Sequence, residues 1–123
     1  MKLQPAIPLF RIFDEALARK FYVDWLGFKV DWEHRFSPCS PIYFQVSRDG
    51  AVFHLTGHYG DCTPGSKAFI IIDDVEALHS ELHSRPHSHM MPGIQDAPWN
   101  ARTIDVTDPF GNRICFSQPN PEP

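Results

Sequence analysis

The clearest pattern of polar and apolar positions lies near the end of the chain and predicts a β-hairpin. Residues 103–107 and 113–118 each alternate polar and apolar side chains, which is typical of half-buried strands. The five residues between them carry turn chemistry. Pro109 fixes φ at the value that a turn requires, and Gly111 and Asn112 both tolerate positive φ. We therefore expect strand, tight turn and strand in this segment.

The first quarter of the chain predicts an edge strand followed by a helix. Residues 6–13 form an apolar run rich in β-branched and aromatic side chains, and its proline favours a strand at a sheet edge or a bulge. Asp14 is a good N-cap residue. From Ala16 onwards the apolar residues recur every three or four positions, Leu17 among them, and Gly27 ends the pattern.

Three more strands complete the first half. Residues 28–35 alternate and predict one strand, and a loop rich in serine and proline follows them. Residues 42–46 and 51–56 predict a hairpin around the sequence Ser-Arg-Asp-Gly, which ends in an Asp-Gly turn. The order of elements in the first half is therefore β-α-β-β-β.

The second half repeats this order. Residues 68–72 predict a strand, Asp73 or Asp74 caps a helix that runs from residue 75 to about residue 84, and a short strand near residues 90–95 leads into the terminal hairpin. The apolar stripe of the helix consists of Val75, Leu78 and Leu82.

This internal repeat predicts an α+β fold in which two βαβββ modules form one concave mixed sheet with the helices on its outer face. We expect a single domain, with module one at about 5–60, module two at about 66–118 and a loose tail at 119–123. A chain of 123 residues with 42% apolar residues suits one packed domain.

Charge and cysteine content narrow the classes of function. The net charge of about −4 is scattered along the chain, which argues against a nucleic-acid or anionic-membrane surface and suits a cationic ligand. No apolar run approaches the ~20 residues of a membrane span, and the first residues lack the apolar core of a signal peptide. Three cysteines with no C-x-x-C pair predict reduced thiols and a cytoplasmic protein.

Four motifs together resemble those of one superfamily. They are F-Y-V-D-W-L-G-F at 21–28, D-D-V-E-A-L-H at 73–79, Pro98-Trp99, and the D-P-F-G-N turn. In this order they resemble the glyoxalase/bleomycin resistance/dioxygenase superfamily, also called the vicinal oxygen chelate fold, and Pro98-Trp99 is similar to the bleomycin-resistance branch. That branch usually has glycine after the tryptophan, where this chain has Asn100. The resemblance implies a homodimer with a ligand groove at its interface.

The resemblance also implies where the enzymes of the superfamily hold a divalent metal. The four positions correspond to Ile7, His54, Ser66 or Lys67, and Cys115. Only the imidazole and the thiol are good ligands for such ions, whereas catalytic divalent sites generally need at least three protein ligands. We therefore expect no catalytic metal and no cofactor. An inert, partly buried thiol is the favoured interpretation of Cys115.

A cleft lined by aromatic side chains is the remaining candidate for a ligand site. Phe44 is better explained as core, whereas Trp99 lies in a polar loop and is poorly placed for the core. The carboxylates of Asp31, Glu33, Asp61 and Asp105 suit a cationic glycopeptide, and we expect Arg102 to pair with one of them. The predicted ligand-binding residues are Trp32, Phe36, Tyr43, His54, Asp61, Trp99, Arg102 and Asp105.

The remaining histidines are interpreted more simply. An inward-facing His54 needs a polar partner, so recognition and a structural role are equally open for it. His58 is more simply a histidine at a strand-to-loop junction. His79 and His83 are spaced i, i+4 on the second helix, and His87 and His89 follow; we expect this group to lie on a solvated face.

These observations lead to one functional hypothesis and two alternatives. The hypothesis is a metal-free antibiotic-binding protein that sequesters bleomycin-type glycopeptides, with no bond made or broken. The first alternative is a metal-dependent lyase, isomerase or dioxygenase of the same fold. The second is a protein that binds another planar metabolite. All three expect a small-molecule ligand and neither nucleic acid nor membrane.

Overall fold

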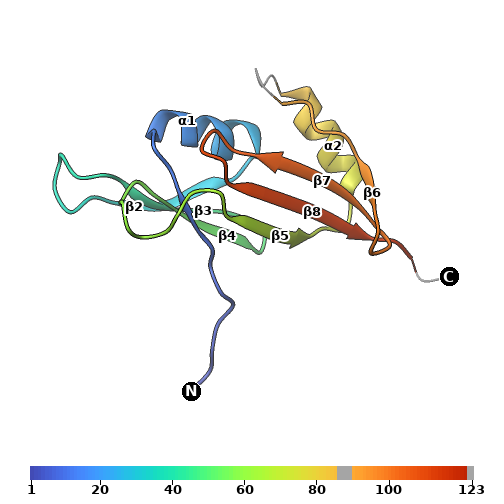
Figure 1. Ribbon diagram of the computed structural model, residues 1–123, viewed down its shortest axis with the longest axis horizontal. Coiled ribbons are helices and arrows are strands. Elements are labelled where there is room, and N and C mark those ends of the chain that lie inside the picture. Colours follow the sequence, from blue (N-terminus) through green and yellow to red (C-terminus); the bar gives the residue numbers. More distant parts are fainter. Residues whose placement is uncertain (86–89, 122–123) are drawn as a thin grey trace. The chain divides into compact units, whose positions relative to one another are not determined.

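The computed structural model describes residues 1–85 and 90–121, and the chain divides into two compact units (Figure 1). The first unit is Met1–Pro64 and the second is Gly65–Pro123. Each unit contains one four-stranded mixed sheet and its own helical segment. The two units are described separately below.

The first unit has the order β-α-β-β-β, and its sheet has the strand order β1-β4-β3-β2. β1 pairs with β4 in parallel, and the other neighbours are antiparallel. A π-helical segment, η1, continues α1 directly. The elements are β1 (Leu9–Arg11), α1 (Glu15–Arg19), η1 (Lys20–Trp25), β2 (Lys29–His34), β3 (Tyr43–Arg48) and β4 (Ala51–Thr56).

The second unit repeats the same connectivity. Its sheet has the order β5-β8-β7-β6, with β5 parallel to β8 and the other pairs antiparallel. The elements are β5 (Lys67–Ile71), α2 (Val75–Ser84), β6 (Gln95–Ala97), β7 (Ala101–Thr107) and β8 (Arg113–Pro119). The α+β fold with two βαβββ modules is therefore confirmed.

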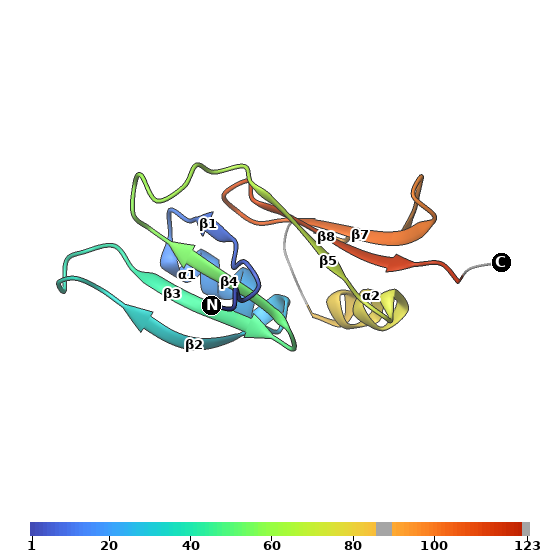
Figure 2. The same ribbon diagram turned by 90° about the horizontal axis from the view of Figure 1, so that it is seen from below.

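One face of the first sheet packs against the helical segment. Phe53 lies at the centre of this core, with its ring 5.1 Å from that of Phe10, 5.6 Å from Phe28 and 6.5 Å from Tyr22 of η1. Burying such aromatic side chains contributes roughly 1.5–3 kcal/mol each. Figure 1 shows α1 on one side of this sheet, and Figure 2 shows the strands from the other side, in front of α1. The opposite face of the sheet thus has no helix of its own unit over it.

Several predicted boundaries were wrong in the first unit. The first strand covers three residues rather than 6–13, and Ile7, between two prolines, is 40% exposed. The predicted helix is present but becomes π-helical from Lys20, and it ends as expected before Gly27, whose φ is 77°. Leu17, expected on the buried stripe, is 45% exposed because it lies on the outer side of α1.

The boundaries in the second unit were closer to the structure. Asp74 rather than Asp73 caps α2, since its side chain accepts a hydrogen bond from the backbone N–H of Ala77. The short strand lies at β6, a few residues after the predicted 90–95. β8 continues to Pro119, and the Asn120 N–H donates to the Asn100 carbonyl, so pairing extends into the segment expected to be a loose tail.

The turn before β8 is held by one buried carboxylate. Asp108 is 5% exposed, and its Oδ1 accepts from the backbone N–H groups of Phe110 (2.9 Å) and Asn112 (2.8 Å). Its Oδ2 accepts from the Asn112 side chain at 2.9 Å. Of the two residues expected to allow positive φ, only Gly111 adopts it, at 92°. The carboxylate therefore accepts hydrogen bonds from two backbone N–H groups of the turn, one of them on the buried Asn112.

Replacing Asp108 by alanine should lower the free energy of unfolding by about 2–3 kcal/mol, because the turn loses three hydrogen bonds to a side chain that is almost fully buried. Urea denaturation followed by circular dichroism measures this change. Asp73→Ala, which removes an exposed carboxylate from the same unit, is the control and should change stability by less than about 0.5 kcal/mol. Equal effects of the two variants would contradict the role of Asp108.

Candidate ligand-binding site

The uncovered face of the first sheet carries polar and aromatic side chains because β3 alternates strictly. Phe44 and Val46 are fully buried in the core, as predicted for Phe44, so Tyr43, Gln45 and Ser47 lie on the other face. Residues opposite each other on neighbouring strands share a face, and the register pairs Gln45 with His54 of β4.

A β-bulge places Trp32 on this same face. The register of β2 against β3 runs from Val30 opposite Val46 to Trp32 opposite Gln45, with a shift between them. Strict alternation would have placed Trp32 on the core face together with Val30. The extra residue of the bulge is Asp31, and it reverses the side on which the strand's next residue lies.

Three rings gather on the uncovered face. Those of Trp32 and Tyr43 are nearly parallel, with 8° between their planes and 6.0 Å between centroids. The His54 ring meets each of them edge-on, with centroids 5.2 Å away in both cases. Trp32 is 43% exposed, so its ring offers apolar surface for stacking. The structure therefore brings together three of the predicted site residues.

A chain of hydrogen bonds runs through the same residues. Gln45 Nε2 donates to Asp31 Oδ2 at 2.9 Å, and Ser47 Oγ donates to Asp31 Oδ1 at 3.0 Å. Gln45 Oε1 lies 2.9 Å from His54 Nε2, and His54 Nδ1 lies 2.7 Å from the Tyr43 hydroxyl. Both ring nitrogens of His54 are thus engaged.

The environment shifts the pKa values of these groups. Burial lowers the pKa of His54 below its ordinary value, which keeps the imidazole neutral. Burial also raises the pKa of Tyr43, and the nearby charge of Asp61 adds to this effect. The hydrogen bonds from Gln45 and then Ser47 lower the pKa of Asp31, so this residue is a carboxylate at neutral pH.

Asp61 and Phe36 lie at the loop end of the same unit. Asp61 Oδ2 accepts a hydrogen bond of 2.7 Å from the buried Thr56 hydroxyl, whose oxygen in turn accepts from the His58 N–H at 3.1 Å. The ring of Phe36, 78% exposed, contacts those of His34 (4.8 Å) and His58 (5.6 Å). Phe36 thus contacts the strand-to-loop junction and not the three-ring cluster.

Trp99 lies between β6 and β7 in the second unit. It is 54% exposed, its indole Nε1–H donates to Ser117 Oγ at 3.2 Å, and its ring is 6.1 Å from that of Phe69. Asn100 has a φ of 59°, so it supplies the left-handed conformation that glycine would otherwise provide. Phe69 and Ile71 are 55% and 69% exposed on β5, and sequence reasoning missed them although they alternate with the buried Ala68.

Arg102 and Asp105 do not lie together, because they are three positions apart on β7 and their side chains therefore point to opposite faces. Arg102 forms an ion pair with Glu76 of α2, on the helical face. The expectation that it pairs with Asp31, Glu33, Asp61 or Asp105 was therefore wrong. Glu33 pairs instead with Arg19 at 2.8 Å. Asp105 is exposed and hydrogen-bonds the Cys115 thiol.

The residues at the superfamily's metal positions do not fit a catalytic divalent ion. Within residues 1–85 and 90–121 no three His, Cys, Asp or Glu side chains are grouped to hold a metal. The Cys115 side chain is buried, and burial together with Asp105 raises its pKa to about 11, so it stays a neutral thiol. Leu9, opposite His54 on β1, has no donor atom. The rings of His79 and His83 lie 4.1 Å apart with 31° between their planes, whereas His87 and His89 lie outside the described residues.

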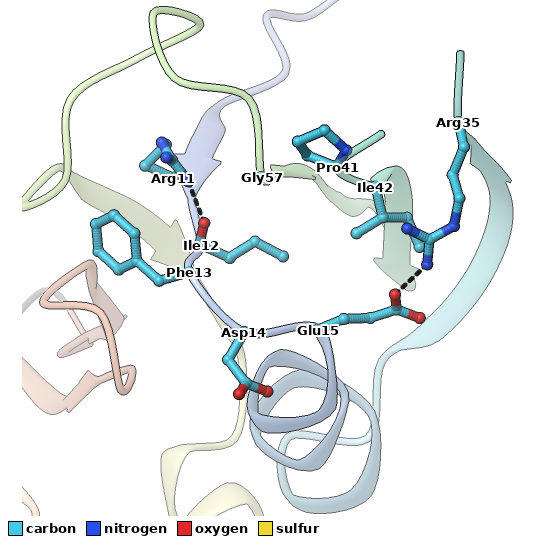
Figure 3. Close-up of a pocket in the computed structure, with 9 residues that line it drawn as sticks. All are labelled: Arg11, Ile12, Phe13, Asp14, Glu15, Arg35, Pro41, Ile42 and Gly57. Carbon is cyan, nitrogen blue, oxygen red and sulfur yellow. Dashed lines mark hydrogen bonds and ion pairs between the residues drawn. The ribbon is translucent and has the colours of Figure 1, made fainter. Parts of the chain in front are cut away.

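A separate cavity of about 290 Å³ lies in the first unit (Figure 3). It contains none of the predicted site residues. The charged side chains around it are largely used within the unit, because Arg35 pairs with Glu15 and Asp14 caps α1. Its lining consists of Arg11, Ile12, Phe13, Asp14, Glu15, Arg35, Pro41, Ile42 and Gly57.

Comparison with known proteins places the chain in a class. Its fold is that of a two-module βαβββ protein, and the family described as "Glyoxalase superfamily protein" matches residues 1–121. The chain therefore belongs to the glyoxalase superfamily. No curated protein sequence matches it. Among the described residues, no helix is long and apolar enough to cross a membrane.

Several solved structures share the fold. The bleomycin-binding protein of bleomycin-producing Streptomyces verticillus, complexed with copper(II)-bleomycin, has a TM-score of 0.74 at 24% identity, covering 98% of this chain and 99% of that one. TnmS3, an antibiotic-binding protein from Streptomyces sp. CB03234, has 0.68 at 25% identity, covering 98% and 100%. A glyoxalase-related enzyme from Clostridium phytofermentans has 0.74 at 19% identity, covering 98% of each chain.

The lowered pKa of His54 predicts a pH dependence of stability. Because the folded protein binds the proton less readily than the unfolded chain, the free energy of unfolding should fall as the pH drops below about 6.5, the ordinary value, and level off below the lowered pKa. Urea denaturation between pH 7.5 and 5 measures this loss. It should be smaller in His54→Gln and unchanged in the control His79→Gln. If the free energy of unfolding falls with pH equally in the wild type and in His54→Gln, the role of His54 in this pH dependence is contradicted.

Proposed function

We propose that this protein is a metal-free binding protein that sequesters bleomycin-type glycopeptide antibiotics in an aromatic groove at a dimer interface. The observation that carries the proposal is the cluster of Trp32, Tyr43 and His54 on a sheet face that no helix of its unit covers. Its rings offer stacking surface, and its polar atoms are already hydrogen-bonded to one another.

The exposed aromatic residues of the second unit support the same proposal. Trp99 and Phe69 contact each other, and both are more than half exposed. Large exposed apolar side chains in contact are typical of binding surfaces. In the proposed homodimer these side chains offer stacking surface to the drug, and carboxylates such as Asp61 and Asp105 attract a cationic ligand.

Sequestration accounts for the chemistry better than catalysis does. His54 has both nitrogens engaged, and Cys115 is a buried neutral thiol, so neither is poised as a base or nucleophile. A protein that binds its ligand without transforming it needs only a complementary surface. A cytoplasmic location is part of the proposal. The structure of the Streptomyces verticillus bleomycin-binding protein complexed with copper(II)-bleomycin supports the choice of ligand.

The test is a calorimetric titration of bleomycin into chelator-treated protein, repeated in the presence of Zn²⁺, Ni²⁺ and Mn²⁺. The proposal predicts saturable binding at about one drug per chain without added metal. Absence of binding in every series would overturn it. Stoichiometric uptake of a metal by the protein itself, lost in His54→Ala, would favour a metal-dependent enzyme. Tight binding of another planar compound while bleomycin fails would favour a metabolite-binding protein.

Trp99→Ala should weaken bleomycin binding at least tenfold, because it removes an exposed stacking surface, without unfolding the protein. Calorimetry gives the affinity, and circular dichroism checks the fold. Met91→Ala removes an even more exposed apolar side chain of the same unit and should leave the affinity unchanged. An unchanged affinity in Trp99→Ala would exclude this residue from the site.

A further inference from the structure

We propose that the hydrogen-bond chain from Asp31 to Tyr43 presents the Tyr43 oxygen as an acceptor, so that the site selects flat cationic ligands carrying N–H donors. Asp31 and Gln45 then act as positioning residues. This inference rests on the proposed function only in so far as the uncovered face of the first sheet binds a ligand; it does not depend on bleomycin as that ligand.

The direction of the chain is set at Asp31. An ionised carboxylate can only accept hydrogen bonds, and the hydrogen bonds from Gln45 and Ser47 keep this one ionised. The Gln45 amide must therefore turn its NH₂ group towards Asp31. Its carbonyl oxygen, which can only accept, is then the atom that faces His54.

His54 passes this direction on to Tyr43. Since Gln45 Oε1 needs a donor, the proton of the neutral imidazole lies on Nε2. Nδ1 then carries a lone pair and accepts from the Tyr43 hydroxyl, at 2.7 Å. The only hydrogen of that hydroxyl is thereby used, and the phenol oxygen is left with acceptor capacity alone.

The surroundings of Tyr43 favour the same kind of ligand. The charge of Asp61 acts on Tyr43, and the Asp61 carboxylate is also an acceptor. The parallel Trp32 ring offers a π-face, which attracts cations. A planar group with N–H donors and a positive charge suits the Tyr43 oxygen, the Asp61 carboxylate and the Trp32 ring. A ligand carboxylate would meet only acceptors and negative charge.

Protonation of His54 reverses the direction. The imidazolium donates from both nitrogens, so Tyr43 must accept from Nδ1 and turn its own O–H towards the ligand. The side chains that face His54 are Tyr43 and Gln45 on β3, Trp32 on β2 and Leu9 on β1. The charged groups nearby are Asp31, which is hydrogen-bonded to Gln45, Asp61, whose charge acts on Tyr43, and Arg11, two residues after Leu9 on β1. Selectivity for donors should therefore be lost in acid.

Three flat probes separate charge from hydrogen bonding: 2-naphthamidinium (cation with N–H donors), N-methylquinolinium (cation without them) and 2-naphthoate (acceptor only). Binding to the full chain is measured by NMR titration at pH 8. We expect naphthamidinium to bind at least fivefold more tightly than methylquinolinium, and naphthoate most weakly. Equal affinities of the two cations, or no binding by any probe, would overturn the proposal.

Three variants test whether the hydrogen-bond chain from Asp31 to Tyr43 causes the preference for naphthamidinium. Tyr43→Phe should reduce the advantage of naphthamidinium over methylquinolinium to less than twofold. Asp31→Asn should reduce it at least threefold, because an asparagine lets the Gln45 amide turn over. Asp24→Asn, which removes an exposed carboxylate of η1 in the same unit, is the control and should keep the full advantage. An undiminished advantage in Asp31→Asn would contradict the positioning role.

Nitrogen-15 spectra of the histidine rings give a readout that a merely structural role would not move. We expect the Nε2–H tautomer for His54 at pH 8 in the wild type and a mixture of tautomers in Asp31→Asn. The Nδ1–H tautomer in the wild type would overturn the proposal. If bleomycin fails to bind while the probes keep their order, only the antibiotic function is rejected; if bleomycin binds and the probes show no order, only this inference is rejected.

Discussion

Each unit has a sheet with two faces and a single helical segment to cover them, and the rest of the structure depends on this constraint. In the first unit the buried face takes the aromatic core around Phe53, packed on η1. Because side chains alternate along a strand, every buried residue of β3 has neighbours on the uncovered face. That face is where Tyr43 and Gln45 lie, and where we propose that the ligand binds.

Side chains on the uncovered face are ordered by hydrogen bonds among themselves. A half-buried imidazole without partners would be costly, and the chain from Asp31 through Gln45 to Tyr43 satisfies both nitrogens of His54. The same hydrogen bonds hold the rings of Tyr43 and His54 in one arrangement, and the Trp32 ring packs against both of them. Preorganisation of this kind reduces the entropy lost on binding.

The fold could be predicted from the sequence because its signals are local. Asp74 as a cap, Gly27 as a helix end and the Asp49-Gly50 turn act through a few neighbouring residues, and the repeat of element order then gave the two modules. Asp49 adopts a φ of 51°, as such a turn requires. The shortened β1 and the π-helical η1 were missed because tertiary packing decides them.

The candidate site could be predicted only in part. The face on which Tyr43 and His54 lie follows from the alternation of side chains along their strands. The position of Asp31 depends on a β-bulge, which the local sequence pattern does not indicate. The partner of Arg102 was missed because Glu76 is far away in the sequence and reaches it only when α2 packs on the sheet. The sequence pattern therefore does not indicate contacts between segments that are distant along the chain.

The central claim is that uncovered aromatic faces bind the ligand while the core does not take part. The chain has three tryptophans, of which Trp32 and Trp99 are exposed on such surfaces and Trp25 is 2% exposed in the core. Their indole N–H signals, followed by NMR as bleomycin is added, test the claim most directly. We predict that the signals of Trp32 and Trp99 shift with saturation while that of Trp25 stays in place. Unmoved signals of Trp32 and Trp99 in a protein that binds the drug would contradict the account.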